Sequence, residues 1–404
     1  MSYPVSLEDL NFLLSHKGQE KLLELSLMDL SNIIPVIEKL RREVTAQEAS
    51  ALVETAILRN RGKEKFSSAH LMYFLSEALE QASGEVIARH RAKRFADYRK
   101  IADLTCGIGG DLLSLAEISP HIMAVDKDRV RMEMARANSK ALGLSEKIEF
   151  FCEDLRRPWH VDAAFADPSR RKGGKRVFNL SDIEPSIGEL MELRATVPDL
   201  CVKILPGVDY EAIPPDCEVE FISHKRICKE AVLWFGNLRK NVSHKYGFNR
   251  SVTILPEHIH IEEEAVEPVP VTEPLSYIYE PDPAIIRGHM VEWLAWKLNA
   301  MKMDHSIAYL TGEKPVKTPL ARVWKIDEVF PFSIKEINRR LKYLKIGEIV
   351  IKKRGTAVEP DVLRKRLKLT EGGVKTTLFL TCLSGKQMAL ICSEINNENC
   401  CYSY

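Results

Sequence analysis

The sequence predicts an α/β protein whose central part is a mostly parallel sheet with helices on both faces, preceded by a helical domain and followed by an α+β domain. Two observations lead to this prediction. From about residue 98, short apolar runs alternate with stretches of helical period, which is the pattern of strands joined by crossover helices. A glycine-rich segment at residues 101–111, IADLTCGIGGD, joins the first such run to the first such helix.

Residues 1–97 carry the spacing of helices, and we expect a helical N-terminal domain. Thr45 and Glu48 form the capping-box pattern that starts a helix, and apolar residues follow at intervals of three and four. Ser6 precedes a similar series. A further apolar stripe is expected to form a helix, and its members are Leu71, Phe74, Leu75, Ala78 and Leu79.

Residues 98–255 form the predicted sheet domain. Its first five strands are apolar runs separated by helical stretches and are expected to be parallel: KIADL, IMAVD, IEFFCED, AAFADPS and LCVKILPG. The last three runs have no long helix between them, so we expect them to finish the sheet with antiparallel strands, at 218–222, 231–236 and 251–255.

The remaining residues are expected to form a linker and a second α/β unit. Residues 256–274 are rich in Glu and Pro and lack a clear period, so we interpret them as an acidic linker whose histidines, His258 and His260, face solvent. Two small domains are expected beyond it, at residues 275–330 and 331–404, and the second contains a predicted hairpin around Ser384 and Gly385.

The composition is that of a globular protein, with 45% hydrophobic residues, 28% charged residues and a formal net charge of +1. Any basic surface must therefore be local. The nine cysteines form no CxxC pair, which argues against a disulfide framework and a cysteine-ligated metal site. No apolar run approaches the roughly 20 residues of a membrane span. We therefore expect a cytoplasmic protein with neither a metal nor a membrane partner.

The loop that begins at Asp103 has the glycines that let a backbone turn sharply and approach a ligand closely, Gly107, Gly109 and Gly110. A dinucleotide-binding loop is the main alternative, because it also joins a strand to a helix. The carboxylate of Asp103 would repel a pyrophosphate and attract a cationic amino group, such as the one in S-adenosylmethionine (SAM). The loop therefore favours SAM over a dinucleotide.

Three more acidic positions follow the ends of the next strands. Asp126 is expected to accept hydrogen bonds from ribose hydroxyls, and Asp154, or Glu153 in its place, from an adenine amino group. Asp167 follows the fourth strand and is expected to orient an acceptor amine and take its proton. Helix capping, solvent exposure and turn formation are the alternative roles. Because the carboxyl ends of parallel strands meet at one edge, we expect these acids in one site.

The ordered set DLTCGIGGD, AVD, CEDL and ADPSR resembles the motifs of class I SAM-dependent methyltransferases, over residues 98–255. The resemblance implies a Rossmann-like sheet in which the loop that includes Thr105 holds the methionine part of SAM. It also implies that Asp167 and Pro168 belong to the catalytic motif of enzymes that methylate exocyclic amines. Residues 80–88 resemble the helix that precedes these motifs in RNA methyltransferases, which makes Ser83 an expected cofactor contact.

One part of the sequence departs from the amine-methylating motif. Ser169 and Arg170 stand where the family has a proline or small residue and then an aromatic side chain. An arginine plane also stacks on bases. The departure keeps two alternatives open: an acceptor on a protein or small molecule, and an RNA-binding protein without the activity.

Two basic segments point to RNA, a polyanion, as the substrate. The first has five basic residues in eight: Arg170, Arg171, Lys172, Lys175 and Arg176. The second, residues 339–368, holds eleven lysines and arginines against three acids, with clusters at Lys352, Lys353, Arg354, Arg364 and Arg366. Solvated surface segments are the alternative.

The C-terminal part also has a family resemblance. Residues 331–404 resemble a THUMP-like domain, an RNA-binding module, and residues 275–330 resemble the ferredoxin-like unit that accompanies it. The leading hypothesis is therefore an RNA methyltransferase that acts on structured rRNA or tRNA.

Overall fold

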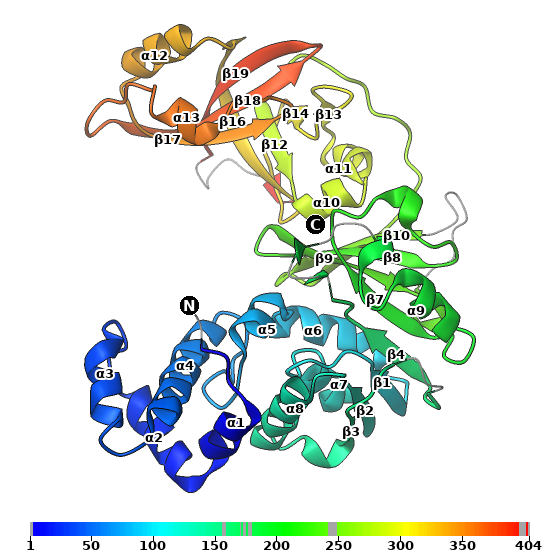
Figure 1. Cartoon of the computed structure of the whole chain (residues 1–404). Coiled ribbons are helices and arrows are strands. Elements are labelled where there is room, and N and C mark those ends of the chain that lie inside the picture. Colours follow the sequence, from blue (N-terminus) through cyan, green and yellow to red (C-terminus); the bar gives the residue numbers. More distant parts are fainter. Residues whose placement is uncertain are drawn as a thin grey trace. The chain divides into compact units, whose positions relative to one another are not determined.

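The computed structural model describes residues 3–155, 159–169, 171–172, 175–176, 180–240, 249–395 and 401–402 (Figure 1). The chain divides into two compact units, which comprise residues 1–219 with 230–249 and residues 220–229 with 250–404. Within the described ranges, no helix has the length and apolar character that a membrane crossing requires.

The first unit begins with the expected helices: α1 (Leu7–Leu14), α2 (His16–Ser26), α3 (Ile33–Leu40), α4 (Ala46–Gly62), α5 (Ser76–Gln81) and α6 (Glu85–Ala92). Ser6 caps α1 and Thr45 caps α4, both with complete capping boxes, as predicted. The helix expected from Leu71 begins only at Ser76. The reason is that the side chain of Asn138 bonds both backbone groups of Tyr73, at 2.7 and 3.0 Å, and holds that segment extended.

A nine-stranded sheet follows, in the order β11-β10-β8-β9-β7-β4-β1-β2-β3. Its strands are β1 (Lys100–Asp103), β2 (His121–Val125), β3 (Ile148–Phe151), β4 (Ala163–Ala166), β7 (Leu200–Ile204), β8 (Glu218–His224), β9 (Ile227–Trp234), β10 (Asn249–Leu255) and β11 (Ile259–Glu262). The neighbouring pairs among β1, β2, β3, β4 and β7 are parallel, and β9 lies antiparallel to β7. The predicted mixed sheet is thus confirmed.

The parallel strands are joined by α7 (Leu112–Ile118), α8 (Arg129–Ala141) and α9 (Ile187–Leu193), and a short hairpin, β5 (Arg171–Lys172) and β6 (Lys175–Arg176), follows β4. Every residue of β4 and β7 is buried. Such continuous burial is typical of central parallel strands. A charged side chain in either strand therefore needs a partner.

Strand β11 differs from the expectation of a featureless acidic linker. It pairs antiparallel with β10, from Ser251 opposite Glu262 to Ile254 opposite Ile259. The Ile-His-Ile alternation explains the difference, because it places Ile261 in the core and His260 on the other face. His260 is half-buried, and its Nδ1 lies 2.9 Å from Thr253 Oγ1, so it is not simply solvated.

The second sheet has seven strands, in the order β13-β14-β12-β16-β19-β18-β17. They are β12 (Tyr277–Pro281), β13 (Met301–Lys302), β14 (Leu310–Gly312), β16 (Ala321–Pro331), β17 (Ile346–Arg354), β18 (Val374–Leu383) and β19 (Lys386–Glu394). The helices of this part are α10 (Pro283–Arg287), α11 (Val291–Leu298), α12 (Ile334–Tyr343) and α13 (Pro360–Arg364), and β15 (Val316–Lys317) pairs with β20 (Cys401–Tyr402).

Strand β16 crosses the domain boundary that we expected at residue 330. It pairs with β12 on one side and with β19 on the other, so the two small domains share one sheet. The hairpin between β18 and β19 is confirmed, with Ser384 and Gly385 both at positive φ, as a tight turn requires.

A buried ion-pair cluster ties α6 to the first sheet. Arg91 has 3% of its side chain exposed and pairs with Asp111 and Glu230. Its guanidinium also lies 5.2 Å from the centre of the Phe165 ring. Charges this deeply buried depend on each other, because removing one leaves the others desolvated without that charge partner.

Replacing Arg91 by alanine should therefore lower the free energy of unfolding by about 3 kcal/mol, measured by urea denaturation of the full chain. Arg89 is a matched control two residues away, with 52% of its side chain exposed and with Glu85 and Glu117 as partners. Its alanine variant should lose less than about 1 kcal/mol. Equal losses in the two variants would contradict the assigned role of Arg91.

Candidate active site

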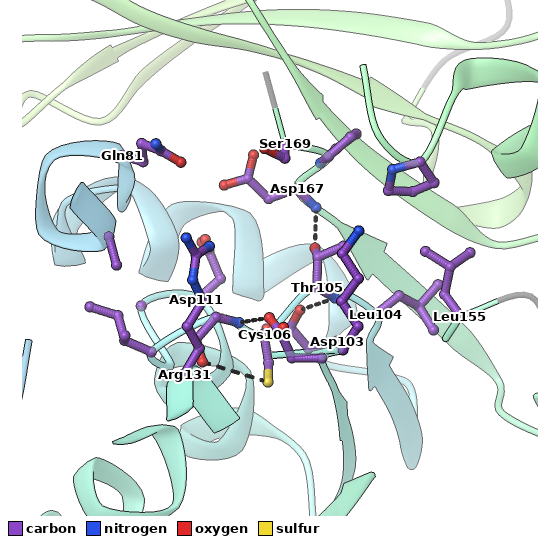
Figure 2. Close-up of a pocket in the computed structure, with 18 of the residues that line it drawn as sticks. Gln81, Asp103, Leu104, Thr105, Cys106, Asp111, Arg131, Leu155, Asp167 and Ser169 are labelled. Carbon is purple, nitrogen blue, oxygen red and sulfur yellow. Dashed lines mark hydrogen bonds between the residues drawn. The ribbon is translucent and has the colours of Figure 1, made fainter. Parts of the chain in front are cut away.

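A pocket lies where β1, β2 and β4 end, inside the first unit (Figure 2). Its wall includes most of the predicted cofactor and catalytic residues: Asp103, Thr105, Gly107, Gly110, Asp126, Glu153, Asp154, Asp167 and Pro168. The structure therefore brings the four acid-tipped strand ends together at one site. It does not place Ser83 or Gly109 on the pocket wall.

Asp103 is the most deeply buried acid of the pocket, with 1% of the residue exposed. Its Oδ1 accepts the backbone N–H of Thr105 at 3.2 Å, whereas its Oδ2, also buried, has no hydrogen-bond partner in the described part of the chain. Burial, with the neighbouring Asp111 carboxylate, holds the pKa of Asp103 well above its usual range. A cationic donor in the pocket would satisfy this oxygen and favour its ionised form.

The glycine loop connects Asp103 to the next acid. Gly107 has a φ of +54°, and its N–H donates to Asp126 Oδ2 at 2.8 Å. Gly109 has a φ of +96°, and a side chain there would meet Ala135 of α8 at 3.6 Å. Gly109 therefore serves the turn and its packing on α8 instead of forming part of the pocket wall.

Asp126 ends the second strand as predicted. In addition to Gly107, the N–H of Asp128 donates to its Oδ1 at 2.8 Å, and burial raises the pKa of Asp126. Each carboxylate oxygen has a second lone pair, so Asp126 can still accept hydrogen bonds from a ligand. This arrangement fits a diol.

The third acidic segment lies beside an apolar wall that the sequence did not reveal. Leu155 lines the pocket next to Asp154. The indole of Trp159 donates to the carbonyl oxygen of Leu155 at 2.8 Å and packs edge-on against Phe151, with ring centres 5.6 Å apart. These contacts hold Leu155 where a flat ring could lie against it.

Asp167 directly follows β4, and Figure 2 shows its carboxylate pointing into the pocket. Its N–H donates to Thr105 Oγ1 at 2.6 Å, and its Oδ2 accepts from Lys203 Nζ at 2.5 Å. Lys203 lies in β7, and no motif of the sequence predicted it as part of the site. The available signal was a single lysine inside the otherwise apolar run LCVKIL.

Two residues near the glycine loop differ from expectation. The hydroxyl of Ser83 donates to Glu230 at 3.2 Å, away from the pocket wall, whereas Gln81 and Ala82 just before it line the pocket. Arg131 of α8, which we did not predict, also lines the pocket, and its Nε is buried.

The basic segment after β4 is only partly described. Arg170 lies outside the described residues. The backbone places Arg171 opposite Arg176 and Lys172 opposite Lys175 in the β5–β6 hairpin. Their contribution to RNA binding stays a prediction.

The basic residues of β17 fall into two groups. Lys352 lies 2.5 Å from Glu280 and above the ring of Trp324, and Arg354 lies above the ring of Tyr309. In contrast to our expectation, these two half-buried side chains pack within the second unit.

The other predicted cations of this unit are more exposed. Lys353 pairs with Glu359 at 2.6 Å, and Arg364 donates to the carbonyl oxygen of Ile349 at 2.8 Å. Arg366 is also exposed.

Two further observations concern clusters of metal-ligating side chains and the thiol of the pocket. The described residues include no cluster of three or more His, Cys, Asp or Glu side chains arranged to hold a metal ion. Cys106 lines the pocket, but burial raises the pKa of its thiol well above the usual range. A thiolate nucleophile is therefore disfavoured at this position.

Comparison with known proteins gives the context of this pocket. Residues 98–204 match the family described as RNA cap guanine-N2 methyltransferase, and residues 321–394 match the THUMP domain-like family. Residues 6–62 match a domain of unknown function. A putative methyltransferase from Porphyromonas gingivalis shares the fold, with a TM-score of 0.72 over 92% of this chain and 100% of that one, at 21% identity.

Two curated relatives are informative to different degrees. A 23S rRNA (uracil(1939)-C(5))-methyltransferase of Shewanella halifaxensis is 32% identical over 93 residues, 21% of each chain. An uncharacterized S-adenosylmethionine-dependent methyltransferase of Mycobacterium tuberculosis is 34% identical over 329 residues, which cover 79% of this chain and 88% of that protein. With the acid-lined pocket at the ends of its parallel strands, this chain belongs to the SAM-dependent methyltransferases.

Proposed function

We propose that this enzyme methylates an amine nitrogen of a base in RNA. The observation that carries the proposal is the position of Asp167. Its carboxylate lies in the pocket that also contains Asp103, and its backbone is fixed by Thr105. A carboxylate beyond the fourth strand can accept an N–H of an amine and direct the nitrogen lone pair toward a methyl donor.

The pocket residues fit SAM, which supplies a methyl group on a positively charged sulfur. The orphaned oxygen of Asp103 suits the cationic amino group, and Asp126 suits the ribose hydroxyls. Arg131 would pair with the carboxylate of the methionine part, which the surrounding acids would otherwise repel. Asp154 would accept a hydrogen bond from the adenine amino group, beside Leu155.

The chemistry of the wall favours nitrogen over carbon as the acceptor. Methylation at a pyrimidine carbon requires activation of the ring, commonly by a thiolate nucleophile. Among the described residues, Cys106 provides the thiol in the pocket wall, and burial favours its neutral form by raising its pKa. An amine already carries a lone pair and needs only orientation and a route for its proton. Asp167 provides both.

Support for RNA comes from outside the pocket. The THUMP domain-like match covers β16 to β19, and exposed cations of this region include Lys353, Arg364 and Arg366. The 23S rRNA methyltransferase of Shewanella halifaxensis is named for an RNA substrate, and the family that matches residues 98–204 is named for an RNA cap. A protein or small-molecule acceptor would leave this basic module without a role.

The raised pKa of Asp103 has a consequence for cofactor binding. Because the amino group of SAM pairs with the ionised carboxylate, affinity should fall about tenfold per pH unit once the pH is below that pKa. Since the pKa is raised, the loss should begin at a higher pH than for an ordinary aspartate. Below that pKa, binding should release a proton. Calorimetry in buffers of different ionisation enthalpy measures this release.

A deaminated analogue of SAM, in which hydrogen replaces the amino group while the carboxylate and the positively charged sulfur are kept, is the matched control for this measurement. It still contacts Asp126, so any pH dependence that arises there is common to both ligands. The difference between the two ligands reports Asp103 alone. Identical pH dependence for both ligands would rule out Asp103 as the amino-group partner.

The direct test of the proposed function uses RNA from cells that lack the protein. Purified enzyme and methyl-labelled SAM should label this RNA, and nucleoside analysis should find the label on a base nitrogen. RNA from cells that contain the protein should accept far less label. Labelling of protein in a total extract, with none in RNA, would favour the alternative acceptor.

A further inference from the structure

We infer that Lys203 is a positioning residue for methyl transfer, which fixes the carboxylate of Asp167 so that its second oxygen receives the acceptor N–H. This inference rests on the proposed function, because it assigns the acceptor to Asp167. The sequence motifs assign no role to this lysine. Its place in the fold does.

The first argument is the burial of Lys203. It is 7% exposed and lies in β7, where its neighbours Val202 and Ile204 are buried and Val232 is opposite on β9. An ammonium group in such surroundings costs several kcal/mol, and its ion pair seldom repays this in full. An apolar side chain in its place would be at least as favourable for folding. The lysine therefore points to a function in the pocket.

The second argument is the geometry of the pair. The register between β4 and β7, with Ala166 opposite Val202, places Asp167 and Lys203 next to each other at the end of the two strands. Lys203 Nζ lies 2.5 Å from Asp167 Oδ2, and the Asp167 side chain is 25% exposed, on the pocket side. Lys203 therefore approaches the carboxylate from the buried side and leaves the pocket side open.

The third argument concerns rotation. The terminal torsion of an aspartate is broad, so an isolated carboxylate samples many orientations. Thr105 fixes the backbone of Asp167, and Lys203 fixes one carboxylate oxygen. Together they reduce the freedom of the other oxygen. Because a misplacement of about 1 Å can cost about 100-fold in rate, this restraint is large enough to matter.

The test compares Lys203→Met, which keeps the length but removes the charge, with Lys203→Arg, which keeps a cationic donor. Methyl transfer to RNA from cells lacking the protein is measured for both. We expect Lys203→Met to lower kcat by about 30- to 100-fold, with the Kd for SAM and the KM for RNA within about twofold of wild type. Lys203→Arg should recover at least about tenfold of this loss.

The double variant Lys203→Met with Asp167→Asn separates positioning from a structural role. If Lys203 acts through Asp167, adding Lys203→Met to the Asp167 variant should change kcat by less than about twofold. An unchanged kcat in Lys203→Met, no recovery in Lys203→Arg, or additive losses would each overturn the inference. If Lys203→Met does not fold, Lys203→Gln, which also removes the charge but keeps a polar side chain, takes its place in both comparisons. A wild-type enzyme that labels no RNA would instead refute the proposed function.

Discussion

Replacing Asp103 by asparagine should weaken SAM binding by at least about 100-fold, and replacing it by alanine should abolish measurable binding. The variants lose the charge that pairs with the amino group at a buried position, where truncation of one partner of a charge pair costs about 2–5 kcal/mol. The buried, unpartnered Oδ2 of Asp103 is the observation behind this expectation. Isothermal calorimetry measures it directly.

The same substitution should affect the stability of the ligand-free protein in the opposite direction. Burial and Asp111 disfavour the ionised form of Asp103, so its pKa is raised and ionisation above its unfolded pKa costs stability as the pH rises. Asparagine removes that cost, and the ligand-free variant should melt at or above the wild-type temperature at neutral pH. Asp126→Asn is the control, and its SAM binding should fall by only about tenfold. Loss of binding together with a collapse of the melting temperature would mean that Asp103 is structural.

Replacing Asp167 by asparagine should lower kcat for RNA methylation by about 10³- to 10⁴-fold while the Kd for SAM stays within about twofold. The amide keeps the shape of the side chain but loses the charge, and it can turn an N–H toward the acceptor nitrogen. Single-turnover transfer of labelled methyl groups, with SAM binding measured in parallel, tests both parts.

Asp162 provides the matched control for Asp167. It lies at the opposite end of β4, where its Oδ2 accepts from the N–H groups of Arg99 and Lys100 at 3.1 and 2.8 Å. Asp162→Asn should leave kcat within about threefold of wild type. If Asp167→Asn transferred methyl groups at the rate of Asp162→Asn, the acceptor would have to lie elsewhere.

The positions of the acids in the pocket could be predicted from the sequence, because each acid is at or next to the end of a strand that the sequence itself indicates. Asp103 is the last residue of its strand, and Asp126 and Asp167 come directly after theirs, and parallel strands bring their carboxyl ends together whatever the details of packing. The partners of these acids follow a different rule. Lys203 and Arg91 meet Asp167 and Asp111 across distances in sequence that no motif covers.

The predictions that were wrong concerned residues whose local sequence pattern is compatible with more than one side-chain direction. Ser83 belongs to a segment that reaches the pocket, but the turn between α5 and α6 directs its hydroxyl to Glu230. The prediction for β17 treated all of its cations as equally exposed. Side chains alternate along a strand, so Lys352 points inward and Lys353 points outward.

The four carboxylates at the strand ends also bear on how the enzyme turns over. They attract a ligand whose sulfur and amino group are both positively charged. Once the methyl group has left, that sulfur is neutral, and the same wall holds the spent molecule less strongly. The positive charge that the sulfur loses in the reaction is thus also the charge that distinguishes SAM from its demethylated by-product. An acid-lined pocket therefore favours release of the by-product and limits its competition with new SAM.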